Sequence, residues 1–242
     1  PGGVGHSWVK NRFVDPSPHG KPFVGEGGIC EKYVKDGISG WRLDVADELP
    51  DRFLEELRDR IHSVNTQSVL IGEVWENAAD KIAYGKRRSY FRGAQLDSVM
   101  NYPTRKALLD FAENGEANAL ASALTDLYSS YPRCVSASLM NLIGTHDTER
   151  VLTLLGNPVK VRENAYAYNA VQEKLRLTAE ERARGVKLLK MISALQFTLF
   201  GFPCVYYGDE AGMEGMSDPF CRYPFPWHKI DGEINEHYKK LG

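Results

Sequence analysis

The stretch Gly37-Ile-Ser-Gly-Trp-Arg-Leu-Asp-Val-Ala-Asp-Glu48 organises the rest of the chain. Its first half is apolar or small, which is typical of a buried strand, and its second half becomes charged where a strand would leave a packed core. Because side chains alternate between the two faces of a strand, Arg42 and Asp44 are expected on the same face. A neighbouring arginine keeps a carboxylate ionised. The pair is therefore either a structural ion pair or a catalytic carboxylate with its partner.

Length and composition limit the class of protein. The 242 residues suit one large domain, and 43% hydrophobic with 26% charged residues allow a sizeable core. The net charge is -2, and the one basic cluster, Lys86-Arg87-Arg88, is expected to be a solvated loop. Nucleic-acid binding needs a broad basic surface, so it is not expected. The longest apolar run, 191–205, contains polar residues and a proline, so no membrane span is predicted.

The cysteines and the start of the chain add two expectations. Four cysteines lie far apart without a CxxC spacing, which argues against a disulfide scaffold or a zinc site and predicts buried free thiols. The chain begins at Pro1 without a methionine or a signal-peptide pattern. We interpret it as an internal piece of a longer protein or a processed one, and its compartment stays open.

Strands and helices are expected to alternate along the chain. Residues 1–26 are rich in Gly, Pro, His and Ser and are interpreted as irregular. Strands are expected within 37–48, 68–75, 95–100, 138–143 and 201–208. Helices are expected at 29–35, from a Thr104 cap to about 113, and onward to about 131. A further helix is expected to begin at Pro50 and to bury Phe53, Leu54, Leu57 and Ile61. The last is expected to begin at a Thr178/Glu181 capping box and to bury Leu188, Leu189, Ile192, Leu195 and Leu199. Loops are expected at 77–90, at 157–176 as a functional loop, and beyond 209.

This alternation predicts an α/β fold with a parallel sheet covered on both faces. Five strand–helix units are counted, whereas a closed (β/α)8 TIM barrel has eight and about 250 residues. The sequence therefore predicts a partial TIM barrel of about five units. The expected division is an irregular segment 1–26, a partial-barrel catalytic domain 27–215 and a loop-rich segment 216–242.

Three acidic residues follow three different predicted strands. Asp44, Glu73 and Asp147 would share the face of a parallel barrel at which active sites form. Retaining glycoside hydrolysis needs two carboxyl groups about 5 Å apart, one that attacks the anomeric carbon and one that protonates the leaving oxygen. Glu73 suits the acid, because its apolar neighbours Ile71, Val74 and Trp75 favour a protonated carboxyl group.

Several short motifs resemble those of the alpha-amylase family of glycoside hydrolases. They are Gly40-Trp-Arg-Leu-Asp44, Gly72-Glu-Val-Trp75 and His146-Asp-Thr-Glu-Arg150, while Phe202-Pro-Cys-Val-Tyr-Tyr-Gly-Asp-Glu210 resembles the family's last barrel strand. Their order and spacing agree from about Val24 to about Glu210. The residue sequences of the motifs are most similar to those of the neopullulanase, cyclomaltodextrinase and amylopullulanase branch. The chain would then cover barrel strands four to eight.

The resemblance implies a role for each site residue. Asp44 would be the nucleophile, Glu73 the general acid/base, and Asp147 the third carboxylate, which binds the sugar at the transition state. Arg42 would hold Asp44, and His146 would contact the sugar in the cleavage subsite. The implied activity is retaining hydrolysis of α-1,4 glucosidic bonds in starch-like oligo- or polysaccharides, with α-1,6 bonds left open.

The roles of several further residues have more than one interpretation. Trp75 and Tyr102 are equally suited to stacking on sugar rings and to the core. Arg150 is expected to bind substrate, with an ion pair to Glu149 as the alternative. Asp209 and Glu210 are expected to cap the following segment.

The family's first motif, an Asp-to-Asn-His stretch, is not found before Asp44. In the family it normally supplies a sugar-binding histidine and supports a calcium-binding asparagine, so structural calcium, possible in the intact family, lacks its ligand motif here. No cofactor is expected for the chemistry itself. The second hypothesis is accordingly an incomplete barrel that retains the site residues but needs its missing half or a homodimeric partner, because open sheet edges invite pairing.

Overall fold

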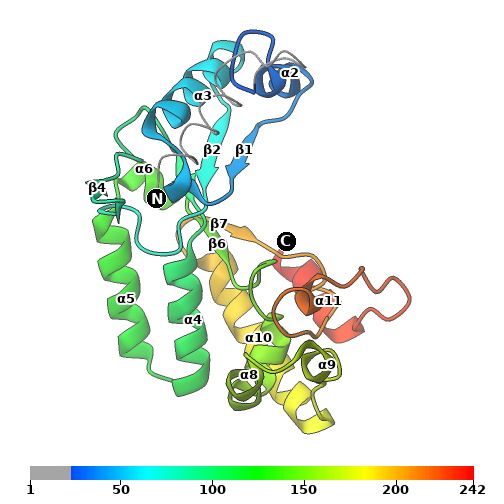
Figure 1. Cartoon of the computed structure of the whole chain (residues 1–242). Coiled ribbons are helices and arrows are strands. Elements are labelled where there is room, and N and C mark those ends of the chain that lie inside the picture. Colours follow the sequence, from blue (N-terminus) through cyan, green and yellow to red (C-terminus); the bar gives the residue numbers. More distant parts are fainter. Residues whose placement is uncertain (1–22) are drawn as a thin grey trace. The chain divides into compact units, whose positions relative to one another are not determined.

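The computed structural model describes residues 23–242, and the predicted irregular segment 1–26 lies outside this range except for 23–26 (Figure 1). The chain divides into two compact units, which we describe separately. Within the described residues, unit 1 comprises 23–100 and 129–140, and unit 2 comprises 101–128 and 141–242. The predicted domain limits at 26 and 215 stay a prediction.

Unit 1 contains a parallel sheet in the order β1-β2-β5. Strand β1 (Gly40–Leu43) pairs with β2 (Val69–Gly72), and β2 pairs with β5 (Ser98–Val99), so the strands predicted in these regions are confirmed, although each is shorter. A Cβ at Gly40 would lie 2.3 Å from the carbonyl oxygen of Val69, so a side chain there would push β1 away from β2.

Two helices of unit 1 lie together beside β1 and β2 (Figure 1). Helix α2 (Ile29–Lys35) has the predicted bounds and is followed by Gly37 with a φ of 105°. Helix α3 (Asp51–Val64) buries the four residues that the period of 3.6 placed on one face, Phe53, Leu54, Leu57 and Ile61. Local sequence signals therefore define this part of the unit.

The predicted loop at 77–90 contains a hairpin, so that prediction is wrong in part. Strand β3 (Ile82–Ala83) pairs antiparallel with β4 (Lys86–Arg87) across Gly85. Arg88 is not solvated as expected. It is buried and donates a 2.6 Å hydrogen bond to the carbonyl oxygen of Leu49. The hairpin is thereby anchored to η1 (Ala46–Glu48) and the residue after it.

The chain then passes through α4 (Tyr102–Asn114) and α5 (Ala117–Ser130) to α6 (Arg133–Ala137). The predicted Thr104 cap is wrong, because the Asn101 side chain accepts from the Thr104 backbone N–H and the threonine is buried inside the helix. Strand β6 (Met140–Leu142) and strand β7 (Phe202–Cys204) are neighbours in a second sheet, and both were predicted.

The core of unit 2 forms around α10 (Ala179–Thr198) and α7 (Val151–Gly156). On α10, Leu189 and Ile192 are fully buried, and the other predicted inward leucines are partly buried against the same core. The core comprises Leu108, Ala112, Ile143, Val151, Leu152, Leu155, Leu189, Ile192, Ile234 and Tyr238. The predicted inward face of α10 is therefore confirmed.

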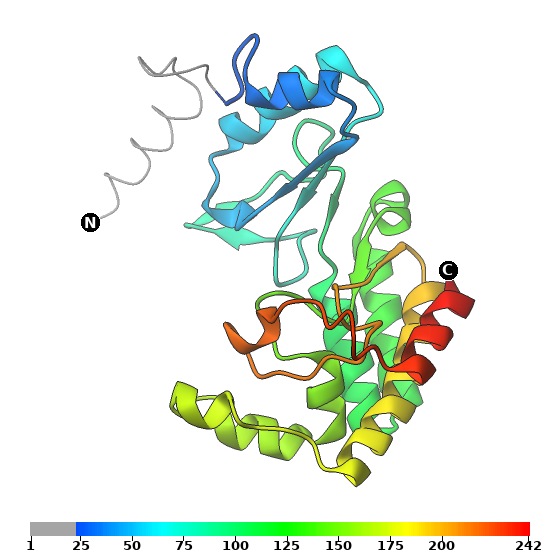
Figure 2. The same ribbon diagram turned by 90° about the vertical axis from the view of Figure 1, so that its right-hand side faces the viewer.

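Two expected loops of unit 2 contain helices. Segment 157–176 forms α8 (Pro158–Asn164) and α9 (Asn169–Gln172). The expected loop beyond 209 contains η2 (Phe220–Arg222) and α11 (Gly232–Leu241), which lies alongside α10 and buries Ile234 and Tyr238 (Figure 2). The parallel strands and their helices fit a partial barrel, and the count of five units stays a prediction.

All four cysteines are free, as predicted, but Cys134 is exposed and Cys204 is partly exposed, so burial is confirmed only for Cys30 and Cys221. None of the helices within 23–242 combines the length and the apolar character that a membrane crossing requires.

The capping box at the start of α10 is confirmed and yields a stability prediction. Glu181 accepts from the Thr178 backbone N–H at 2.7 Å, and this bond, together with those from Asn157 and Lys160, lowers the pKa of Glu181 to about 2 from 4.5. Because the folded-state pKa is lowered, the stabilisation is present above pH 4.5 and is lost as the pH falls towards 2. We expect Glu181→Ala to lower the free energy of unfolding by about 1 kcal/mol at pH 7 and by much less at pH 2.5. Urea denaturation at both pH values tests this, with the exposed Glu180→Ala as the control. An equal loss at both pH values would contradict it.

Candidate active site

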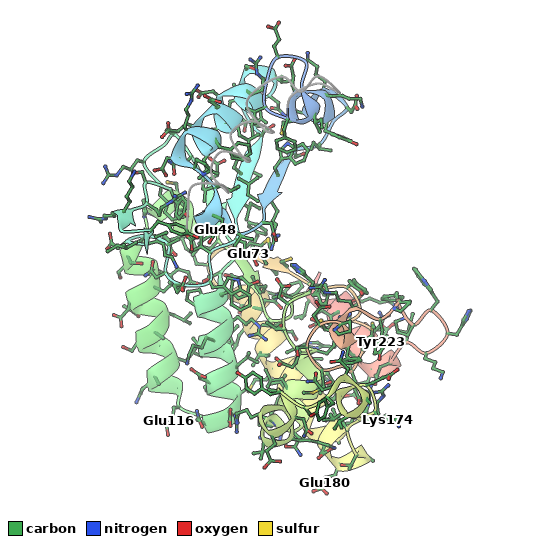
Figure 3. The ribbon with its side chains drawn as sticks, in the orientation of Figure 1. Glu48, Glu73, Glu116, Lys174, Glu180 and Tyr223 are labelled. Atoms are coloured by element: carbon green, nitrogen blue, oxygen red, sulfur yellow. The ribbon has the colours of Figure 1, made fainter. Side chains whose placement is uncertain are left out.

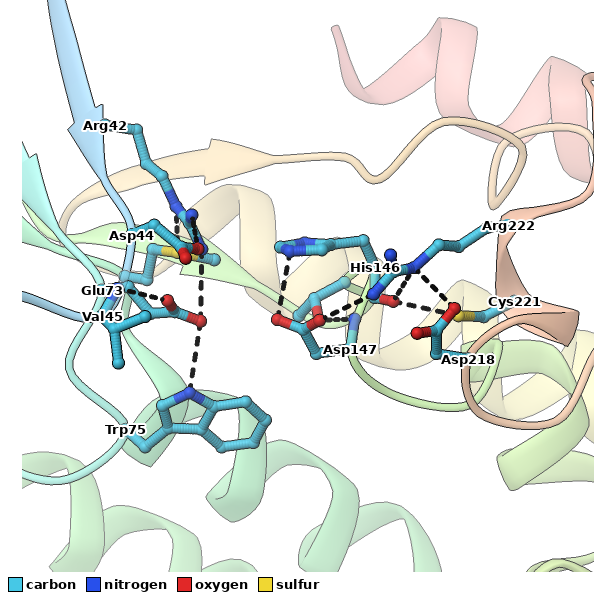
Figure 4. Close-up of polar contacts among 12 residues, drawn as sticks. Arg42, Asp44, Val45, Glu73, Trp75, His146, Asp147, Asp218, Cys221 and Arg222 are labelled. Carbon is cyan, nitrogen blue, oxygen red and sulfur yellow. Dashed lines mark hydrogen bonds and ion pairs between the residues drawn. The ribbon is translucent and has the colours of Figure 1, made fainter.

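Arg42 lies between two carboxyl groups of unit 1. Its Nη1 donates to Asp44 Oδ1 at 2.5 Å, and its Nη2 lies 3.2 Å from Glu73 Oε1 (Figure 4). The predicted contact between Arg42 and Asp44 is therefore present. The Asp44 side chain is 68% exposed and that of Glu73 only 5%. One guanidinium thus joins an open carboxylate to a buried carboxyl group.

Glu73 follows directly after β2 and is held by further donors (Figure 3). The Val45 backbone N–H donates to its Oε2 at 2.8 Å, and the Trp75 indole N–H donates to its Oε1 at 3.2 Å. Both carboxyl oxygens therefore have fixed partners, which orients Glu73 beside Asp44.

Val45 has a left-handed backbone, with φ of 45° and ψ of 57°. A β-branched residue rarely adopts this conformation, which costs on the order of 1–2 kcal/mol. The conformation accompanies the hydrogen bond from Val45 N–H to Glu73. The sequence did not predict this contact, because a valine is not expected to adopt a left-handed backbone conformation.

Trp75 is 46% exposed, whereas Tyr102 is 5% exposed and lies at the start of α4. Tyr102 is therefore a core residue. Trp75 is not, and its indole N–H already contacts Glu73. Stacking of Trp75 on a sugar stays a prediction.

In unit 2, His146 and Asp147 follow β6 and contact each other. His146 Nε2 lies 3.1 Å from Asp147 Oδ2, and the Asp147 backbone N–H donates to Thr145 Oγ1 at 2.9 Å. Arg222, from η2, donates to Asp147 Oδ1 at 3.0 Å and to the His146 carbonyl oxygen at 2.9 Å (Figure 4). Arg222 was missed, because 75 residues separate it from Asp147 and no spacing links them.

Arg150 has a different environment from the one expected. It is 1% exposed, and its Nη1 donates to Asp209 Oδ1 at 3.1 Å and to the Tyr207 carbonyl oxygen. Its guanidinium carbon lies 4.4 Å from the Tyr206 ring centre. The expected pair with Glu149 is wrong, and the expected substrate contact is corrected to a buried ion pair, since the side chain leaves no surface for a ligand.

Asp209 is also corrected, because it is the buried partner of Arg150 and not a cap. It is 1% exposed, and a Cβ at Gly144 would lie 2.0 Å from its Oδ2. Burial raises the pKa of Asp209 to about 7, and the Arg150 guanidinium opposes that rise. The pair joins the loop after β7 to the segment that carries His146 and Asp147.

The residues do not form an evident metal site. Within 23–242, no three side chains of His, Cys, Asp or Glu come close enough together to hold a metal ion. Calcium binding through backbone and amide oxygens is a separate question, and the absence of a cofactor stays a prediction.

Comparison with known proteins decides the family. The sequence profile described as "Alpha amylase, catalytic domain" matches residues 24–240. The chain belongs to the alpha-amylase family. The resemblance inferred from its motifs is therefore confirmed.

Its relatives include enzymes of the branch that the motifs indicated. The chain is 36% identical over 208 residues to a cyclomaltodextrinase of Geobacillus thermopakistaniensis, covering 84% of this chain and 29% of that protein. It is 33% identical over 247 residues to an amylopullulanase of Thermoanaerobacter thermohydrosulfuricus, covering 97% of this chain and 15% of that protein. The chain therefore spans less than a third of either relative.

A solved structure supports the same fold. The ligand-free cyclic α-maltosyl-(1→6)-maltose hydrolase of Arthrobacter globiformis matches with a TM-score of 0.69 and 29% identity, over 88% of this chain and 41% of that one. This member of the alpha-amylase family thus has the fold of part of a catalytic barrel.

Proposed function

We propose that the protein is a retaining glycosidase that hydrolyses α-glucosidic bonds of starch-like glucans. The observation that supports it most is the guanidinium of Arg42, which contacts both Asp44 and Glu73. An exposed carboxylate beside a buried carboxyl group, both in contact with one guanidinium, is a pairing that suits a nucleophile and a general acid.

The proposed reaction has two steps. Asp44 attacks the anomeric carbon while Glu73 gives its proton to the glycosidic oxygen, and the bond between that carbon and that oxygen breaks. Glu73, now ionised, takes a proton from water, which attacks the glycosyl ester and releases Asp44. Asp147, whose Oδ1 accepts from Arg222, is proposed as the third carboxylate, which binds the sugar at the transition state, with His146 as a further sugar contact.

The relatives' names guide the substrate. The names cyclomaltodextrinase and amylopullulanase refer to cyclic maltodextrins and to pullulan, and the hydrolase from Arthrobacter is named for cyclic α-maltosyl-(1→6)-maltose. We therefore propose α-1,4 bonds as the principal target and α-1,6 bonds as a second one.

A second candidate is that the 242-residue chain cleaves nothing alone. This candidate is supported by the small share of the relatives that the chain spans, since most of the length of those relatives lies outside the match. In this case the site residues act only together with other barrel residues or in an oligomer.

Incubation with a chromogenic maltooligosaccharide, a cyclodextrin and pullulan tests both candidates. Dye or reducing-sugar release by the chain, abolished in Asp44→Asn, would support the glycosidase. Release only after the remaining barrel residues are supplied would support the second candidate. No release in either case, from folded protein, would contradict both.

A further inference from the structure

An exposed tryptophan stands on the loop between η2 and α11 of unit 2. The Trp227 side chain is 75% exposed, although it is the largest apolar side chain type. Single exposed apolar residues are common and need no explanation. The surroundings of Trp227 are what make it informative.

The ring is held in place before any ligand arrives. Its centre lies 4.6 Å from that of Phe225, at 55° between the planes, and the Trp227 backbone N–H donates to the Phe225 carbonyl oxygen at 3.0 Å. Pro224 and Pro226 flank Phe225 and restrict the backbone. A ligand that used this ring would meet little further loss of conformational freedom.

The loop is continuous with the Asp147 half of the candidate site. It begins directly after Arg222, which donates to Asp147 and to the His146 carbonyl. The Tyr207 hydroxyl donates to the Tyr223 carbonyl oxygen at 3.0 Å, which connects the loop to the residues after β7. Trp227 is the fifth residue after Arg222, so their Cα atoms lie at most about 18 Å apart.

The chemistry of the ring and its neighbours fits a sugar. A pyranose presents an apolar C–H face that packs on the negative face of an aromatic ring, and a rim of hydroxyls that need polar partners. His228 and Lys229, both exposed, follow Trp227 and can serve that rim.

We propose that Trp227, supported by Phe225, is a stacking subsite for an α-glucan chain whose other end lies at Asp147. The inference rests on the proposed function and extends it, because this subsite would select longer oligosaccharides. Trp227 binds the substrate and takes no part in the chemical step.

Calorimetric titration of the 242-residue chain with maltotriose and maltoheptaose tests the subsite. We expect Trp227→Ala to weaken maltoheptaose binding about tenfold relative to maltotriose, and Trp227→Phe to retain most of the affinity. Tyr166→Ala is the matched control, because Tyr166 is a fully exposed aromatic residue of the same unit. Far-UV circular dichroism confirms that each variant is folded.

The outcomes separate the two proposals. Binding of both sugars with no selective loss in Trp227→Ala, or an equal loss in Tyr166→Ala, would overturn the subsite and leave the proposed function standing. No binding of either sugar by the unmodified chain would overturn the subsite, and the absence of turnover after the barrel is completed would overturn the function as well.

Discussion

Glu73→Gln is expected to lower kcat/KM on maltooligosaccharides by about 10³-fold in any preparation that hydrolyses them. Glutamine has the size of glutamate but carries no proton that it can give to the leaving oxygen. It also cannot accept equally from Arg42, Val45 N–H and the Trp75 indole, because one of its two polar atoms is a donor.

The dependence on the leaving group distinguishes this role from a structural one. A strongly acidic leaving group departs without being protonated. In Glu73→Gln, the rate of the first step should therefore fall far less for a glycoside with such a leaving group than for a natural glucan. Steady-state and burst kinetics on both substrates measure the difference. Glu76→Gln is the matched control, because Glu76 lies three residues further on, 65% exposed and paired with Lys81. An equal loss on both substrates would contradict Glu73 as the acid.

Arg150→Met is expected to lower the free energy of unfolding by about 3 kcal/mol at pH 9, where Asp209 would be ionised without a cation beside it. The substitution keeps an apolar stem but leaves Asp209 without its cation, and it removes the donor to the Tyr207 carbonyl. Urea denaturation followed by circular dichroism measures the loss. Arg162→Met is the control, since its pair with Glu113 is 57% and 37% exposed and should contribute far less to stability.

The stability of the protein is also expected to depend on pH through Asp209. The pKa of Asp209 is raised from 3.8 to about 7 by burial, so its contribution to stability is fully present below pH 3.8 and declines as the pH rises to 7. Without Arg150 the pKa rises further, so stability should keep falling above pH 7. Adding Asp209→Asn should remove that decline. A flat profile in Arg150→Met between pH 7 and 9 would contradict a buried ion pair.

Local signals predicted much of the fold. Gly37 after an apolar helix and the period of Phe53, Leu54, Leu57 and Ile61 both act within one turn or two, so α2 and the buried face of α3 follow from sequence alone. The Thr178/Glu181 capping box is equally local. The short polar helix α8 was missed because it has no apolar period. Asn157 before Pro158 was nevertheless a start signal that the sequence offers, and in the structure the Asn157 side chain accepts from the Lys160 N–H.

The site was predictable only where it follows strands. The sequence placed Asp44, Glu73 and Asp147 at strand ends, and the structure brings Arg42 to both carboxyl groups of unit 1. Contacts made by tertiary packing were beyond reach: the left-handed Val45, the ion pair of Arg150 with Asp209, and Arg222 on Asp147 depend on segments that meet only in the folded chain.

Mass spectrometry of a trapped intermediate tests the central proposal most directly. Glycosidase-competent protein would be incubated with a fluorinated maltosyl fluoride, whose fluoride leaves readily while its ring fluorine slows hydrolysis of the ester, and then digested. We expect one maltosyl adduct on the peptide that contains Asp44, absent in Asp44→Asn. An adduct on another residue, or hydrolysis with inversion of the anomeric centre and no adduct, would contradict it.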